Sequence, residues 1–119
     1  MNKLIKTSFL FGLFLYSNIL FADIKTPSIK EYMNDTSGIY DSYIYGVESG
    51  LEWASEYYFR KYQIELFCKP NGIKLPSSRL REIINREIQK KPGFFDKYKN
   101  EPLLGLALRN GYIDEFPCQ

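Results

Sequence analysis

The segment Ile39–Tyr62, IYDSYIYGVESGLEWASEYYFRKY, decides the fold. It contains no proline, and its apolar residues return every three or four positions, which is the spacing of one face of an α-helix. This apolar stripe consists of Tyr40, Tyr43, Ile44, Val47, Leu51, Ala54 and Tyr58. The segment therefore predicts one long helix whose stripe faces the core.

Two more helical patterns flank this segment. Residues 26–33 read as a short helix with Thr26 as its N-cap and Pro27 at the first helical position. Residues 76–91 carry a second apolar stripe, and Pro92-Gly93 ends that helix.

A last helix is expected near the carboxyl end of the chain. Asn100 is its predicted cap and Pro102 lies in its first turn, while Gly111 weakens or ends it. Its predicted core residues are Leu103, Leu104, Leu106, Ala107 and Leu108. The four patterns together predict a small all-α domain of four-helix type.

Gly46 and Gly50 interrupt the long helix at a spacing of four residues. Each glycine costs about 1 kcal/mol of helix stability relative to alanine. Together they flatten one helix face, so that another helix can approach closely. The sequence predicts such a contact either within the monomer or across a homodimer.

The long helix also carries acidic and aromatic side chains. Glu48, Glu52 and Glu56 are spaced to form one acidic ridge, which is either a solvated face or a surface that steers a basic partner. Tyrosine, phenylalanine and tryptophan are too dense in this helix for one buried face. We expect half of them in the core and half at an interface.

The first 22 residues have the three parts of a secretory signal. A basic start with Lys3 and Lys6 precedes an apolar run, and Ala22 provides a small residue at the cleavage site. Cleavage after Ala22 leaves residues 23–119 as one domain in the periplasm, without a membrane anchor. That part holds 14 basic and 14 acidic residues, so its charge predicts no affinity for nucleic acid.

Cys68 and Cys118 are the two cysteines of the chain. An isolated pair in a small exported domain is typical of a disulfide, because the periplasm is oxidising. The loop that it closes spans about fifty residues, which by chain entropy stabilises the fold by roughly 4 kcal/mol. We therefore expect one disulfide that ties the tail to the middle of the chain.

The sequence offers little for catalysis. It contains no histidine, no Cys-x-x-Cys motif and no glycine-rich phosphate loop. Glu48 and Glu52 lie one helical turn apart, but a solvated helix face gives such a pair no burial that would suit one of them to general acid catalysis. We predict a binding protein, not an enzyme, without a metal or other cofactor.

The strongest candidate for a binding surface is the segment that joins the last two helices. It contains Phe94, Phe95, Asp96, Lys97 and Tyr98, which combine aromatic anchors with a charged rim. The alternative is that Phe94 and Phe95 fold back as a lid on the core. The acidic ridge of Glu48, Glu52 and Glu56 is the second candidate.

Three motifs occur in a family-specific order: Tyr43-Ile44-Tyr45-Gly46-Val47 followed by Gly50, then Cys68-Lys69-Pro70, then Phe116-Pro117-Cys118. In this order the chain resembles the Rap/Tai family of periplasmic immunity proteins. That resemblance implies a disulfide-bonded helical fold that blocks the cleft of a peptidoglycan amidase delivered by type VI secretion. The cognate amidase would then be its partner. The alternative function is a periplasmic stress or chaperone-like binding protein.

Overall fold

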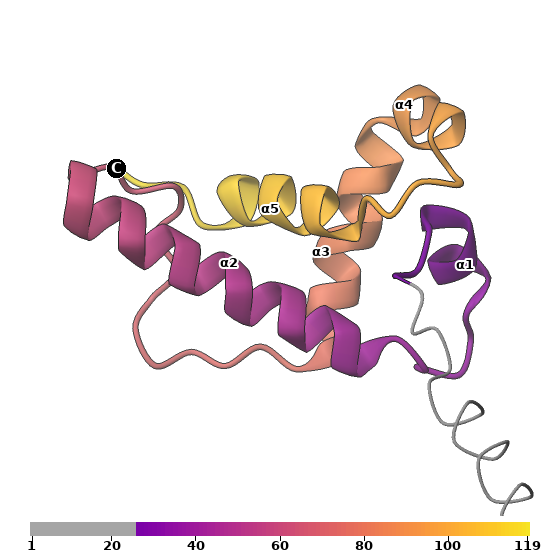
Figure 1. Cartoon of the computed structure of the whole chain (residues 1–119), viewed down its shortest axis with the longest axis horizontal. Coiled ribbons are helices and arrows are strands. Elements are labelled where there is room, and N and C mark those ends of the chain that lie inside the picture. Colours follow the sequence, from indigo (N-terminus) through magenta and orange to yellow (C-terminus); the bar gives the residue numbers. More distant parts are fainter. Residues whose placement is uncertain (1–25) are drawn as a thin grey trace, which may run out of the picture.

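The computed structural model describes residues 26–119 (Figure 1). The predicted signal peptide, residues 1–22, and its cleavage site after Ala22 lie outside this range. Within the described part every regular element is a helix, so the predicted all-α class is confirmed. The helices are α1 (Ile29–Asn34), α2 (Asp41–Tyr62), α3 (Ser77–Lys90), α4 (Pro92–Lys97) and α5 (Leu104–Glu115). None of these helices is both long and apolar enough to cross a bilayer.

The core forms where α3 packs against α5 and where α2 lies alongside α5 (Figure 1). The helix α3 supplies Leu80, Ile83, Ile84 and Ile88 to it, and α5 supplies Leu104, Ala107, Leu108 and Tyr112. Ile44 is the contribution of α2, and Ile29, Tyr32, Phe67 and Phe95 complete the cluster. Each set recurs at helical spacing, so a single face of each helix is buried.

Two predicted helix boundaries and one predicted linker are wrong. The N-cap of α1 is Ser28, not Thr26, because the Ser28 hydroxyl accepts a hydrogen bond from Glu31 N while the Glu31 carboxylate accepts one from Ser28 N. The last helix begins at Leu104, not near Asn100, because Pro102 disfavours helical backbone at the residue before it. The segment after Lys91 is not a plain linker but an additional short helix, α4.

Gly111 was expected to weaken or end the last helix, yet α5 continues past it to Glu115. Gly111 is buried, and a Cβ added there would overlap the Ile83 side chain of α3. The glycine therefore allows α3 and α5 to approach closely. This is the close helix contact that the sequence had suggested for other glycines.

The long helix α2 is confirmed, but only part of its predicted apolar stripe is buried in the core. Ile44 is its buried residue in the described structure, and Tyr43, Val47 and Leu51 pack partly against the core. Tyr58, which the stripe also contains, is exposed. Among the described residues, the carboxyl-terminal half of α2 therefore contributes no buried side chain to the core.

The predicted disulfide joins Cys68 to Cys118, with their Cα atoms 5.0 Å apart. Gln63 ends α2 with a left-handed backbone, and the chain then returns as an extended leg beside α2. Cys68 N donates a hydrogen bond of 2.7 Å to Phe116 O, which holds this leg against the tail. The rings of Phe67 and Phe116 pack edge-on against Tyr112 beneath it.

Candidate protein-binding surfaces

The helix α4 sits at the end of the molecule where α3 turns back into α5 (Figure 1). Pro92 occupies the first turn, where its missing N–H removes no hydrogen bond. Phe95 N donates to Lys91 O, and Tyr98 N donates to Phe94 O, each over 3.1 Å. These bonds turn the predicted linker into a defined helical turn.

The structure separates the two phenylalanines of α4. Phe95 is only 2% exposed and belongs to the core, so its predicted role as a surface anchor is wrong. Phe94 and Tyr98 are 41% and 38% exposed, with ring centroids 5.0 Å apart. Lys97 lies beside them, its Nζ 5.2 Å from the Tyr98 ring centroid. We call Phe94, Lys97 and Tyr98 the α4 tip, while Asp96 is exposed on the same short helix.

Hydrogen bonds from α1 hold the segment that follows the α4 tip. Ile29 N donates to Glu101 O over 3.1 Å, and Lys30 N donates to Lys99 O over 2.8 Å, so α1 fixes the segment that follows α4. The Tyr32 hydroxyl donates to Asn85 Oδ1 on α3 over 2.8 Å. The tip aromatics are therefore held in place before any partner arrives.

The acidic ridge does not form a free anionic face. Lys69 Nζ lies 3.3 Å from Glu48 Oε1 and also forms an ion pair with Glu52. Glu56 pairs instead with Arg60 over 2.5 Å. Because Glu48 and Lys69 are mostly buried, the predicted solvated ridge is wrong at Glu48, and its charge is largely neutralised within the chain.

Lys69 and Tyr112 are the residues that sequence reasoning missed here. The Tyr112 hydroxyl donates to Glu48 Oε1 over 2.5 Å, and burial together with this bond raises the pKa of that hydroxyl. Burial lowers the pKa of Lys69, but the ion pairs with Glu52 and Glu48 outweigh it and raise the pKa. The one available signal was the position of Lys69 directly after Cys68, because the Cys68–Cys118 disulfide ties this segment to the tail that follows α5, the helix of Tyr112.

Gly46 and Gly50 lie on an open face of α2. Among the described residues no heavy atom lies within 4 Å of a Cβ built at either position, so they mediate no close packing within the monomer. Trp53 and Tyr57 continue the same face and are 69% and 54% exposed. Ile39 and Ile64 flank the two ends of α2 and are exposed as well. We call Gly46, Gly50, Trp53 and Tyr57 the outer face of α2.

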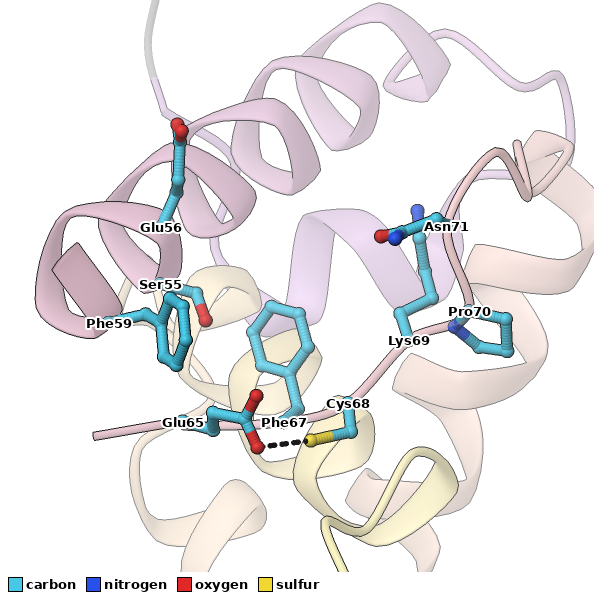
Figure 2. Close-up of a pocket in the computed structure, with 9 residues that line it drawn as sticks. All are labelled: Ser55, Glu56, Phe59, Glu65, Phe67, Cys68, Lys69, Pro70 and Asn71. Atoms are coloured by element: carbon cyan, nitrogen blue, oxygen red, sulfur yellow. Dashed lines mark hydrogen bonds between the residues drawn. The ribbon is translucent and has the colours of Figure 1, made fainter. Parts of the chain in front are cut away.

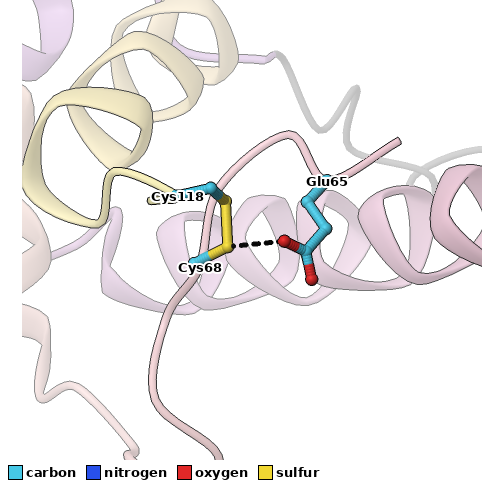
Figure 3. A group of neighbouring side chains, drawn as sticks. All are labelled: Glu65, Cys68 and Cys118. Atoms are coloured by element: carbon cyan, nitrogen blue, oxygen red, sulfur yellow. Dashed lines mark hydrogen bonds between the residues drawn. A yellow bond between two sulfur atoms is a disulfide. The ribbon is translucent and has the colours of Figure 1, made fainter. Parts of the chain in front are cut away.

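An open hollow of about 330 Å³ lies between the carboxyl-terminal part of α2 and the extended leg (Figure 2). Two aromatic rings line it, together with polar residues of α2 and residues of the leg: Phe59, Phe67, Ser55, Glu56, Glu65, Cys68, Lys69, Pro70 and Asn71. The Glu65 carboxylate reaches to within 3.1 Å of Cys68 Sγ (Figure 3). Since both sulfurs are consumed by the disulfide, the group Glu65, Cys68 and Cys118 has no thiolate to offer a metal.

Among the described residues, exposed aromatic side chains gather at the α4 tip, on the outer face of α2 and at the carboxyl end of α2, where Tyr58, Phe59 and Tyr62 are exposed. Each combines large apolar area with neighbouring charge, as protein interfaces do. The chain matches no family model, no curated protein and no solved structure.

Proposed function

We propose that residues 23–119 form a periplasmic immunity protein that binds and blocks a type VI secreted peptidoglycan amidase. The observation that carries the proposal is the α4 tip, where Phe94 and Tyr98 stand exposed on a helix anchored by buried Phe95. The order of the Tyr-Ile-Tyr-Gly-Val, Cys-Lys-Pro and Phe-Pro-Cys motifs supports the same assignment through the resemblance to the Rap/Tai family.

A plug for an enzyme cleft needs a narrow, rigid projection. The α4 tip is one turn of helix at the end of the molecule, and α1 braces the segment behind it (Figure 1). Aromatic side chains lose little conformational freedom on binding and are frequent interface hot spots. Lys97 at their edge supplies a charge that fixes orientation.

The rest of the chain is suited to binding without chemistry. It contains no histidine to act as a general acid or base near neutral pH. The Cys68–Cys118 disulfide supports export to an oxidising compartment. The protein would protect the cell by occupying the cleft of the amidase, not by modifying it.

A chaperone-like role is the alternative, and the exposed aromatic residues of α2 favour it. A chaperone would bind many unfolded proteins weakly through a broad apolar surface. An immunity protein binds one folded enzyme in a fixed ratio. Titration of the chain with a folded Cys/His amidase encoded beside it, and with a reduced unfolded protein, separates the two roles.

Truncating the α4 tip tests the proposal directly. We expect Tyr98→Ala or Phe94→Ala to weaken binding to the amidase by about 2 kcal/mol or more, roughly thirtyfold in Kd, mainly through faster dissociation. Surface plasmon resonance measures the rates, and survival of cells exposed to the amidase reports protection.

Ile73→Ala is the matched control, because Ile73 is as exposed as Phe94 but lies far from it in the chain, in the segment before α3. Phe95→Ala is unsuitable as a test, since it removes a core residue and destabilises the fold. If the Phe94→Ala and Tyr98→Ala variants fold normally and protect cells as well as the unmodified chain, the α4 tip is not the plug.

A further inference from the structure

We infer that a hollow between α3 and α5 binds a free α-amino acid group, with the ammonium of that group on Glu87 and its carboxylate on Arg109. This site is separate from the α4 tip and does not depend on the proposed function. The hollow has a volume of about 390 Å³ and is lined by Glu87, Lys91, Arg109, Asn110, Ile113 and Asp114. We call it the α3–α5 hollow.

The hollow forms because α3 crosses α5 instead of running along it (Figure 1). The two helices come into close contact where Gly111 meets Ile83, since a Cβ at Gly111 would overlap the Ile83 side chain. Glu87 lies one helical turn beyond Ile83 on α3. Helices that cross separate on either side of their contact, which leaves room beside Glu87 for a small ligand.

Glu87 is a buried carboxylate without hydrogen bonds. Its side chain is 1% exposed, and neither of its oxygens accepts a hydrogen bond within residues 26–119. Lys91 Nζ lies 3.1 Å from Glu87 Oε1 as an ion pair, but the two groups do not have hydrogen-bond geometry. Such a carboxylate is unfavourable, because burial has removed its hydration without a replacement. A ligand ammonium has three N–H donors and would supply that replacement.

Arg109 offers the opposite charge from α5. Its Nε and Nη2 atoms donate to Asn110 Oδ1 over 3.1 and 3.0 Å. Asn110 is neutral, so these bonds leave the charge of the guanidinium uncompensated in the part of the chain that the structure describes. Asp114, the other acid of the hollow, already pairs with Lys90 over 2.9 Å. Because a guanidinium can bind a carboxylate through two parallel hydrogen bonds, Arg109 is suited to a ligand carboxylate.

A group that carries both charges on one carbon fits this hollow better than a simple cation or a simple anion. A cation would meet Glu87 but be repelled by Arg109 and Lys91, and an anion would leave Glu87 without a donor. Once an ammonium binds Glu87, the half-exposed Lys91 is released to the ligand carboxylate beside Arg109. Ile113 is 41% exposed and offers apolar contact to the side chain of the amino acid.

Isothermal titration calorimetry with leucine tests the chemistry of the site. We expect saturable binding with a Kd of about 1 mM or below, which is within reach of a ligand of this size that makes two charged contacts. Isocaproate lacks the ammonium and isoamylamine lacks the carboxylate, so each should bind weaker by about tenfold or more. Absence of binding by both enantiomers of leucine, or equal binding of either analogue, overturns the inference.

Two variants test the assigned residues. Glu87→Gln and Arg109→Gln each remove one charge, and each should raise the Kd for leucine by about tenfold or more. Arg109 is exposed, so Arg109→Gln keeps the fold and tests the site even where Glu87→Gln destabilises it. Glu101→Gln and Arg60→Gln alter exposed residues outside the hollow and are the controls, with an unchanged Kd. The same Kd for Arg109→Gln and Arg60→Gln overturns the inference.

The amino acid group can come from two sources: a free amino acid, or an amino acid that a larger molecule holds only by its side chain. A peptide that carries lysine attached through its side-chain nitrogen represents the second source. Either preference supports the site, and the tighter of leucine and this peptide identifies the source. A Tyr98→Ala variant that loses amidase binding should still bind leucine, which keeps this inference distinct from the proposed function.

Discussion

Lys69 shows how much a single side chain contributes to this small fold. Its ammonium group lies between Glu48 and Glu52 of α2 and 5.9 Å from the centroid of the Tyr112 ring of α5. One residue thereby connects the extended leg to both helices beneath it. Glu48 in turn accepts a hydrogen bond from Tyr112, so the two acids and the lysine form one network.

We expect Lys69→Ala to lower the free energy of unfolding by about 2 kcal/mol, because it leaves a mostly buried Glu48 without its cation. Urea denaturation followed by circular dichroism measures this loss. Lys74→Ala removes an exposed lysine from the same connection and serves as the control. Equal midpoints for the two variants would show that the network adds nothing to stability.

At the scale of helices, the glycines of this chain act in opposite ways. Gly111 lies where α5 meets α3, and a Cβ there would overlap Ile83. Gly46 lies on the outer face of α2, where the surrounding described residues leave open space. The same substitution should therefore have opposite effects at the two positions.

Gly111→Ala should destabilise the chain by about 1–3 kcal/mol through overpacking, although alanine is the better helix former. Gly46→Ala should stabilise the monomer by up to about 1 kcal/mol, because it gains helix propensity at no steric cost. Thermal unfolding of the two variants beside the unmodified chain measures both changes. A gain in Tm for Gly111→Ala would contradict the packing of α5 against α3.

At the scale of the whole molecule, Arg81 connects three helices. It donates to Asp41 Oδ1 at the start of α2 over 2.8 Å and to Asp35 Oδ2 after α1 over 3.1 Å. Hydrogen bonds from Ser37, together with Arg81, lower the pKa of Asp35 to about 2. A hydrogen bond from Lys90 on α3 likewise lowers the pKa of Asp114 on α5.

These lowered pKa values predict that acid destabilises the fold. An aspartate whose folded pKa lies below its unfolded value of about 3.9 stabilises the protein above that pH, and this stability disappears as the pH falls toward the folded pKa. We expect the Tm to fall between about pH 5 and pH 2. Asp35→Asn should lower the Tm at neutral pH, and its difference from the unmodified chain should shrink as the pH falls. A constant difference would exclude Asp35 from the acid response.

The sequence by itself determined the local elements and the covalent link. The apolar stripes predicted the helices now called α2 and α3 to within two residues at each end. This was possible because the periodicity of apolar side chains and the helix-ending effect of proline are local signals that extend over one or two helical turns. The cysteine count was enough to predict the Cys68–Cys118 disulfide. The all-α class followed from these elements.

Only the tertiary structure decided which side chains are free to meet a partner. Phe94 and Phe95 are neighbours in sequence, yet one is exposed and the other belongs to the core. In the sequence Glu48 has the pattern of a solvated acid, but in the structure it contacts Lys69 and Tyr112, the latter 64 residues away. Such contacts depend on where separate helices cross and end in space, and a local pattern of residue types carries no information about that.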